Sequence, residues 1–240
     1  MPVFFKPREI VVPGQLLARG NYKTGQYTYQ VGNKIYSKIV GLAECKNNNI
    51  ITVIPLNKPY IPKVGDYVIG KVVDVGLSAW LLDINAPYTA SLPLSEVLAK
   101  ADITKIDLSE YFEIGDYILC KIIAFDKTRD PLVTIKEKNC GKIRKGVVVE
   151  VSPAKIPRII GKEGSMISMI KKELKVEIHV GQNGRIWIYS KENKSEVEEF
   201  AARIIKRIER EAHVSGLTDR IRKMIEEYKS CKRSRRKRRR

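Results

Sequence analysis

The sequence of 240 residues is poor in the residues that hold metals and form disulfides. Its cysteines and histidines are few and scattered, and no two cysteines form a Cys-x-x-Cys pair. They are Cys45, Cys120, Cys140, Cys231, His179 and His213. Structural zinc sites need paired Cys or His ligands, and disulfide-rich domains carry closely spaced cysteines. The sequence therefore predicts neither a metal site nor a disulfide framework, and we expect no cofactor.

Long hydrophobic runs are also missing. No apolar stretch approaches the roughly 20 residues that a membrane-spanning helix needs. Residues 1–10 are mixed in character and too short in apolar length for a secretory signal. We therefore expect a cytoplasmic location and no membrane partner.

Signatures of catalysis are absent as well. The sequence contains no phosphate-binding P-loop, no cluster of metal ligands and no nucleophile with a matching base. Acidic residues are plentiful, but no pair of them stands out from an ordinary solvated surface. We expect a chain that is not an enzyme.

Positive charge, in contrast, is abundant. The chain has 45 Lys and Arg against 27 Asp and Glu, a formal net charge of +18. The segment 232–240 supplies eight of these charges, so more than half of the excess lies in the rest of the chain. This balance indicates a polyanionic partner, and nucleic acid is favoured. The basic tail, residues 231–240, is expected to be disordered and to hold RNA without sequence specificity.

One short motif points to nucleic acid more directly. Gly161 and Gly164 are three residues apart, which allows a tight turn where side chains would block a ligand, and the helix that follows offers N–H groups to a phosphate. Lys162 and Arg158 are the candidate phosphate contacts, whereas Glu163 repels phosphate and weakens the site. A plain helix-entry turn is the commoner origin of such a glycine pair, so the context decides.

The context is an alternation of strands and helices around this loop. The pattern predicts strands over 145–151, 176–180 and 185–189 and helices over 165–174 and 195–212. This order resembles the type I KH domain, whose GxxG loop clamps about four nucleotides of single-stranded nucleic acid. We expect residues 144–230 to form an α+β KH domain that ends in an amphipathic helix.

The middle of the chain, residues 63–138, is predicted to form a small barrel. Five strands are predicted, with a short helical piece over 95–99 between the third and the fourth. The predicted strands are 64–75, 80–84, 88–92, 117–124 and 132–135. Five strands in this order suggest an OB-type β-barrel, whose second and third strands carry an oligonucleotide-binding face.

Within this barrel, Gly65-Asp66, Gly115-Asp116 and the segments 78–83 and 94–98 resemble the RNA-binding repeat of ribosomal protein S-one. The resemblance implies surface aromatics that stack on bases and basic residues that contact phosphates. Ordinary barrel packing of the rings and solvated strand positions for the lysines remain the alternatives. The candidates are Trp80 and Tyr88 for stacking, and Lys71, Lys121 and Arg129 for phosphate.

Residues 1–62 form a third zone, with glycines at intervals of five to nine residues and four tyrosines between positions 22 and 36. Short strands joined by glycine turns are the simplest account, so an all-β domain is expected. The tyrosines, at positions 22, 27, 29 and 36, suit either a protein interface or the core of this domain.

The three zones together resemble the exosome cap subunit of the ribosomal-RNA-processing-protein-four type in its archaeal form. The resemblance rests on Val12-Pro13-Gly14, on the junction 60–70 and on Gly181-Gln182-Asn183-Gly184, which matches a GxNG signature. It implies that Gly181, Asn183 and Gly184 are structural and lie where the KH and S-one domains meet.

The same resemblance implies a function and a set of partners. Three copies would sit as a homotrimeric cap on a hexameric ring of RNase PH-like subunits, with the N-terminal domain docked on the ring. The S-one domains would surround a pore through which single-stranded RNA reaches the phosphorolytic sites. The chain itself would be non-catalytic.

Two other functions remain open. A free-standing transcription or translation factor also combines S-one and KH domains, but it would not need residues 1–62 for docking. A polynucleotide phosphorylase carries both domains behind a catalytic core of several hundred residues, for which this chain has no room. The sibling cap subunit that ends in a zinc ribbon is disfavoured because paired cysteines are absent.

Overall fold

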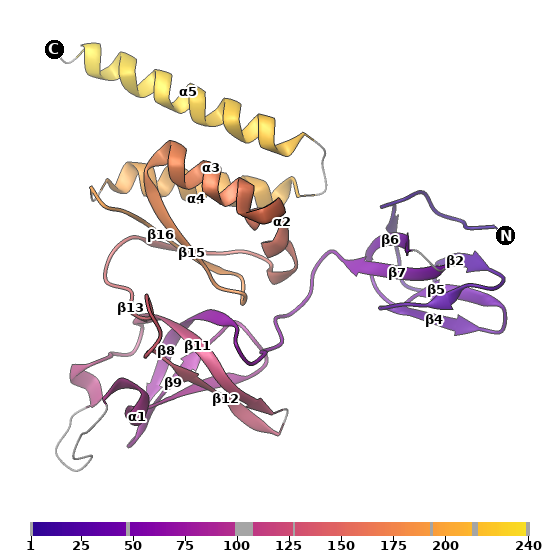
Figure 1. Ribbon diagram of the computed structural model, residues 1–240, viewed down its shortest axis with the longest axis horizontal. Helices are drawn as coiled ribbons and strands as arrows, with labels where there is room; N and C mark the ends of the chain where they lie inside the picture. Colours follow the sequence, from indigo (N-terminus) through magenta and orange to yellow (C-terminus); the bar gives the residue numbers. More distant parts are fainter. Residues whose placement is uncertain are drawn as a thin grey trace. The chain divides into compact units, whose positions relative to one another are not determined.

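The computed structural model describes residues 2–46, 49–98, 108–126, 128–192, 194–212 and 216–238. The chain divides into two units, Met1–Lys58 and Pro59–Arg240, whose elements are traced in Figure 1. The multidomain class expected from the sequence is confirmed: an all-β N-terminal domain, a five-stranded barrel and an α+β KH domain. No helix in the described part of the chain is long and apolar enough to cross a membrane.

The first unit consists of two small sheets. Their strand orders are β1-β6-β7-β3 and β2-β5-β4. The strands are β1 (Ile10–Val11), β2 (Leu16–Arg19), β3 (Lys23–Thr24), β4 (Thr28–Val31), β5 (Lys34–Ser37), β6 (Gly41–Lys46) and β7 (Ile50–Pro55). Leu17, Ile35 and Ile51 lie in its core. The close approach of β6 to β7 requires a glycine, because a Cβ at Gly41 would lie 2.4 Å from the carbonyl oxygen of Ile54.

The tyrosines of this unit divide between two roles. Tyr22 and Tyr27 pack against the core. Tyr29 and Tyr36 occupy paired positions on β4 and β5, and their rings stack with centroids 5.5 Å apart. All four are half-buried.

The second unit begins with the barrel. Strand β8 pairs with β9 and β11, β9 pairs with β10, and β10 runs parallel to β12, which closes the barrel on β11. The elements are β8 (Tyr67–Val75), β9 (Ala79–Asp83), β10 (Thr89–Pro93), α1 (Leu94–Val97), the 3₁₀ turn Leu108–Glu110, β11 (Tyr117–Asp126), β12 (Arg129–Thr134) and β13 (Gly141–Lys142). This is the five-stranded OB arrangement. The helical piece expected over 95–99 corresponds to α1, and Ala99 lies outside the described residues.

The KH domain follows directly. Its elements are β14 (Val147–Glu150), the 3₁₀ turn Pro153–Lys155, α2 (Ile156–Ile160), the 3₁₀ turn Lys162–Gly164, α3 (Ser165–Leu174), β15 (Val176–Val180), β16 (Arg185–Ser190), α4 (Ser195–Arg210) and α5 (Leu217–Arg238). Strand β16 lies between β14 and β15 and is antiparallel to both. The helices lie on one side of this sheet (Figure 1) and share a core with it.

Helix α5 is longer than the sequence analysis predicts. Leu217, Ile221 and Ile225 bury its first turns in the KH core, and the helix continues to Arg238. The expectation of a disordered tail is therefore wrong for residues 231–238. No Gly or Pro interrupts this segment, and Arg and Lys are good helix formers, so a helix anchored at Leu217 extends through it.

Candidate nucleic-acid interface

The GxxG loop between α2 and α3 has the backbone that its glycines were expected to allow. Gly161 has φ 78° and ψ 175°, and Gly164 has φ 77° and ψ 10°. Both values lie where residues with a Cβ are strained. A Cβ at Gly161 would also lie 2.8 Å from the Cβ of Met166, whereas one at Gly164 would make only an ordinary contact with Ser168 Oγ at 3.9 Å. The first glycine thus permits a close approach of the loop to α3.

The charges around this loop are mixed. Lys162 and Glu163 are both exposed, and Glu163 itself adopts a left-handed conformation with φ 53°. Arg158 is exposed on α2. Helix α3 begins after Gly164, which has no side chain to cap it, so no N-cap side chain bonds the first N–H groups of the helix. The loop can bind an anion, with Glu163 opposing it.

The barrel places two of the expected phosphate contacts beside tyrosines. Lys71 on β8 lies opposite Tyr117 on β11, and Lys121 on β11 lies opposite Tyr67 on β8. Each ammonium group lies over the ring of its partner, 5.9 Å from the centroid of Tyr117 and 5.5 Å from that of Tyr67. Lys121 is also bonded to Glu137 at 2.7 Å. Lys71 lies opposite Asp83 on β9, and its charge helps to lower the pKa of that carboxylate.

Neither tyrosine was among the binding residues expected from the sequence. Tyr67 is 40% exposed, and it alternates with buried Val68 along the strand. The two-residue period of a strand was the signal that could have found them, since positions 67, 71, 117 and 121 share the outer face of the β8–β11 pair.

Trp80, in contrast, is not a surface residue. Its side chain is completely buried in the barrel, its indole N–H donates to the carbonyl of Leu108 at 3.2 Å, and Phe112 packs edge-on against it. A buried ring cannot stack on a base, so the expectation that Trp80 binds RNA is wrong. On β9, Trp80 and Leu82 share the inward face, where the indole ring fills part of the barrel core.

The other two barrel candidates lie near the β11–β12 hairpin. Tyr88 is half-buried and packs edge-on against Phe125, with ring centroids 5.0 Å apart. Arg129 is exposed at the start of β12, opposite Asp126. The structure thus brings Lys71 and Lys121 onto one face and places Tyr88 and Arg129 beside the hairpin.

The Gly181–Gly184 turn joins the KH domain to the barrel. Asn183 is completely buried, and its side-chain amide donates to the carbonyls of Ile69 at 2.8 Å and Ile84 at 2.9 Å while accepting from the Ile69 N–H at 3.3 Å. The turn has no space for larger residues at its ends. A Cβ at Gly181 would lie 2.4 Å from Asn183 Oδ1, and one at Gly184 would lie 2.2 Å from a backbone carbonyl oxygen.

Arg185, directly after this turn, connects the two domains electrostatically. Its side chain is 5% exposed and pairs with Asp83 of the barrel and, at 2.8 Å, with Glu150 of β14. Burial by itself lowers the pKa of Arg185, but hydrogen bonds to the two carboxylates outweigh it and raise that pKa. Burial likewise raises the pKa of Asp83, and the hydrogen bond from Arg185 reverses this and holds it below its ordinary value.

Three aromatic rings stack on the outer face of the KH sheet. His179 on β15 lies opposite Trp187 on β16, and Tyr189 continues the row, with neighbouring centroids 4.9 Å and 4.6 Å apart. All three are half-buried. Burial, followed by the positive charge of Lys171, lowers the pKa of His179, which favours the neutral form of its ring. The alternation with buried isoleucines in β16 was the sequence signal for this row.

Comparisons with known proteins agree with this domain order. Residues 8–57 match the family model of the exosome RNA binding protein RRP4 N-terminal domain, residues 59–124 match that of the RRP4 S1 domain, and residues 146–194 match that of the KH domain.

Curated relatives match almost the whole chain. The Rrp4 exosome complex component of Thermococcus kodakarensis is 46% identical over 226 residues, which cover 93% of this chain and 87% of the relative. That of Thermofilum pendens is 44% identical over 228 residues, which cover 94% and 95%. A crystal structure of an exosome complex RNA-binding protein superposes with a TM-score of 0.68 at 40% identity, covering 73% of this chain and 99% of that one. The chain therefore belongs to the Rrp4 family of exosome complex components.

Proposed function

We propose that this chain is a non-catalytic RNA-binding subunit of an exosome complex, which captures single-stranded RNA and delivers it to a ring of RNase PH-like subunits for 3′-to-5′ degradation or processing. The observation that carries the proposal is the match, along more than nine tenths of the chain, to relatives named as exosome complex components. Three copies form the cap on the hexameric ring, and the N-terminal domain docks there.

The chemistry of the site supports this role. The GxxG loop offers backbone N–H groups and Lys162 to a phosphate, and the barrel offers Lys71 beside the ring of Tyr117, with Tyr67 on the same face. Phosphate contacts supply affinity that any RNA sequence can use, while stacking tolerates every base because each has an aromatic face. Such a surface suits a subunit that must accept many different transcripts.

The test is reconstitution with the ring. Phosphorolysis of poly(A) RNA by the isolated RNase PH-like ring is measured with and without this chain, and size-exclusion chromatography reports whether a complex forms. We expect a complex, tighter RNA capture and faster decay. When the chain alone is incubated with poly(A) RNA in phosphate buffer, it should release no nucleotides.

Two results would contradict the proposal. RNA binding without a complex would indicate a free-standing RNA-binding factor. Phosphate-dependent degradation by the isolated chain would indicate an enzyme. A variant without residues 1–58, the first structural unit, serves as the docking control, because it should retain RNA binding and lose the complex.

A further inference from the structure

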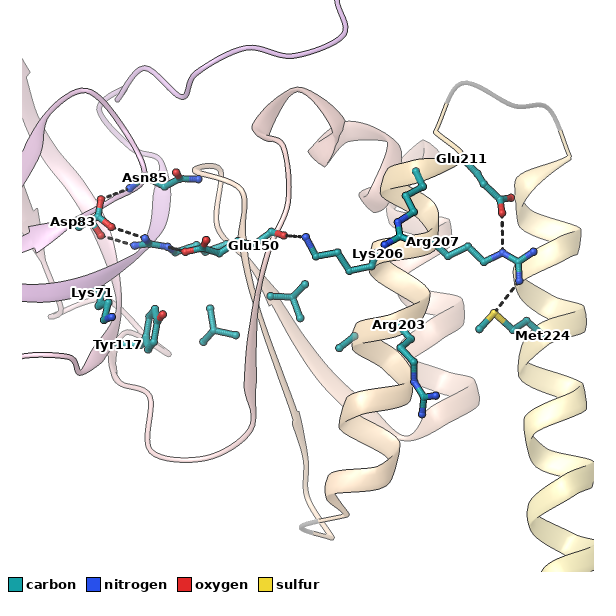
Figure 2. Close-up of a pocket in the computed structure, with 15 residues that line it drawn as sticks. Lys71, Asp83, Asn85, Tyr117, Glu150, Arg203, Lys206, Arg207, Glu211 and Met224 are labelled. Atoms are coloured by element: carbon teal, nitrogen blue, oxygen red, sulfur yellow. Dashed lines mark hydrogen bonds and ion pairs between the residues drawn. The ribbon is translucent and has the colours of Figure 1, made fainter.

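A large groove lies between the barrel and helix α4 of the KH domain. It encloses about 1260 Å³ and its lining includes six basic and three acidic residues. Figure 2 shows Lys71 and Tyr117 on the barrel side and Arg203 and Lys206 on the helix side, with Glu150 between them. The GxxG loop does not contribute to it, and Asp83, the last residue of β9, is the lining residue from the β9–β10 pair.

The cations of the helical wall form one stripe. Arg203, Lys206, Arg207 and Arg210 follow the i, i+3, i+4, i+7 spacing that places residues on the same face of a helix. All four are exposed. With a rise of 1.5 Å per residue, the stripe extends for about 10 Å, long enough to meet more than one phosphate.

Not all of these charges are free for a ligand. Lys206 bonds the backbone carbonyl of Glu150 and the carboxylate of Glu209, and Arg207 bonds Glu211 at 2.8 Å. Arg185 is committed to Asp83 and Glu150.

Three lining cations form no ion pair with a carboxylate within the described part of the chain. Lys71 lies over the ring of Tyr117 and Arg203 over the ring of Phe200. Lys71 also acts electrostatically on Asp83, its cross-strand neighbour, but that carboxylate is bonded to Arg185. Arg210 completes the set. These cations stand on both walls of the groove, since Lys71 belongs to β8 and the arginines to α4.

The walls are held at a fixed separation. Arg185 bridges Asp83 of the barrel and Glu150 of β14, and Asn183 bonds the barrel backbone beside it. Because these contacts are made within the chain itself, binding would not have to order the two domains first, which lowers its entropic cost.

We propose that this groove binds the phosphate backbone of single-stranded RNA, with Lys71, Arg203 and Arg210 as the cations that contact it. The proposal rests on the proposed function and extends the RNA contact surface from Lys71 and Tyr117 of the barrel across the groove to helix α4, apart from the GxxG loop. RNA fits better than an acidic protein segment because Tyr117 places an aromatic ring beside Lys71, and a nucleotide offers both a phosphate and a base to such a pair.

The experiment measures the salt dependence of binding. A fluorescein-labelled single-stranded oligoadenylate is titrated with the full chain over a series of KCl concentrations. The variant is Arg203→Gln with Arg210→Gln, because glutamine keeps the helix propensity and removes the charge. The matched control is Arg222→Gln with Lys223→Gln, two exposed cations of α5 outside the groove. Circular dichroism melting checks that both variants fold.

The expected result is a weaker salt dependence for the groove variant only. Each lost phosphate contact on single-stranded nucleic acid reduces the slope of log K against log salt by about 0.7, so the double variant should lose about 1.4. A triple variant that adds Lys71→Gln should have a still smaller slope. The control variant should keep the wild-type slope.

Other outcomes would overturn the inference. A groove variant with the wild-type slope, or a control that loses as much, would remove the groove from the RNA path while leaving the proposed function intact. If RNA binds the wild type and the groove variant equally, whereas polyglutamate competes for the wild type alone, the groove would be assigned to an acidic protein segment. Wild-type protein that binds no RNA at all would overturn the proposed function as well.

Discussion

Asn183 of the KH domain bonds both backbone groups of Ile69 in the barrel, donating to its carbonyl at 2.8 Å and accepting from its N–H at 3.3 Å. A side-chain amide here replaces the backbone partner that a neighbouring strand would supply. The same amide also reaches the carbonyl of Ile84. The junction of the two domains is therefore continuous with the hydrogen-bond network of the barrel.

Replacement of this amide should destabilise the chain. Asn183→Ala leaves one backbone N–H and two carbonyls without these partners in a buried place, where an unsatisfied group costs about 1–3 kcal/mol. We expect the free energy of unfolding to fall by about 3 kcal/mol in urea denaturation. Gln182→Ala is the control, because Gln182 is exposed and uses its backbone N–H to bond Tyr67. Equal losses in the two variants would contradict a structural role for the amide.

The Asp83–Arg185 pair predicts a stability change in acid. The folded-state pKa of Asp83 is below its ordinary value of 3.8, so the unfolded chain takes up the proton first as the pH falls. The contribution of this carboxylate is complete above pH 3.8 and is lost as the pH drops through the lower folded value. Asp83→Asn should be less stable than wild type at neutral pH, and the two should converge in strong acid. A gap that stays constant from pH 7 to pH 2 would argue against the pair.

The two loop glycines should differ in their tolerance of a methyl group. Gly161→Ala introduces both backbone strain and a Cβ 2.8 Å from Met166, whereas Gly164→Ala introduces strain alone. Strained backbone conformations cost about 1–3 kcal/mol each. We expect thermal melting to show a larger loss for the first variant. The reverse order would mean that the loop rearranges without cost around Met166.

The exposed tyrosines of the barrel should contribute to RNA affinity. Tyr67→Ala removes a ring that lies beside Lys121 on the outer face, and loss of one stacked base weakens binding by about 1–3 kcal/mol. Tyr111→Ala is a matched control, since Tyr111 is 38% exposed against 40% for Tyr67 and lies outside the β8–β11 pair. Fluorescence anisotropy with oligoadenylate measures both. An unchanged affinity for Tyr67→Ala would remove this face from the binding surface.

Local pattern predicted much of the KH domain. The expected helix over 165–174 and strand over 176–180 coincide with α3 and β15, because helical periodicity and the glycine before Ser165 mark these boundaries without tertiary information. The five strands and the order of the barrel followed from turn signals and β-branched runs in the same way.

The direction of side chains and the groove were harder to predict. Trp80 and Leu81 are neighbouring apolar residues on β9, so the sequence does not say which of the two faces inward. The groove combines residues of β8, β14 and α4, which are separated by long stretches of sequence. No local pattern brings them together, because their meeting depends on the bonds of Asn183 and Arg185 across the domain junction.

The bridge through Arg185 also has a mechanical consequence. Its carboxylate partners belong to different domains, Asp83 to the barrel and Glu150 to the KH sheet. An RNA strand pulled along the groove would exert force on both domains at once. The Arg185 bridge and the Asn183 amide would bear this force before the loop that connects the domains. The barrel and the KH domain would then move as one rigid body, so that a force applied to the RNA at one domain would be transmitted to the other.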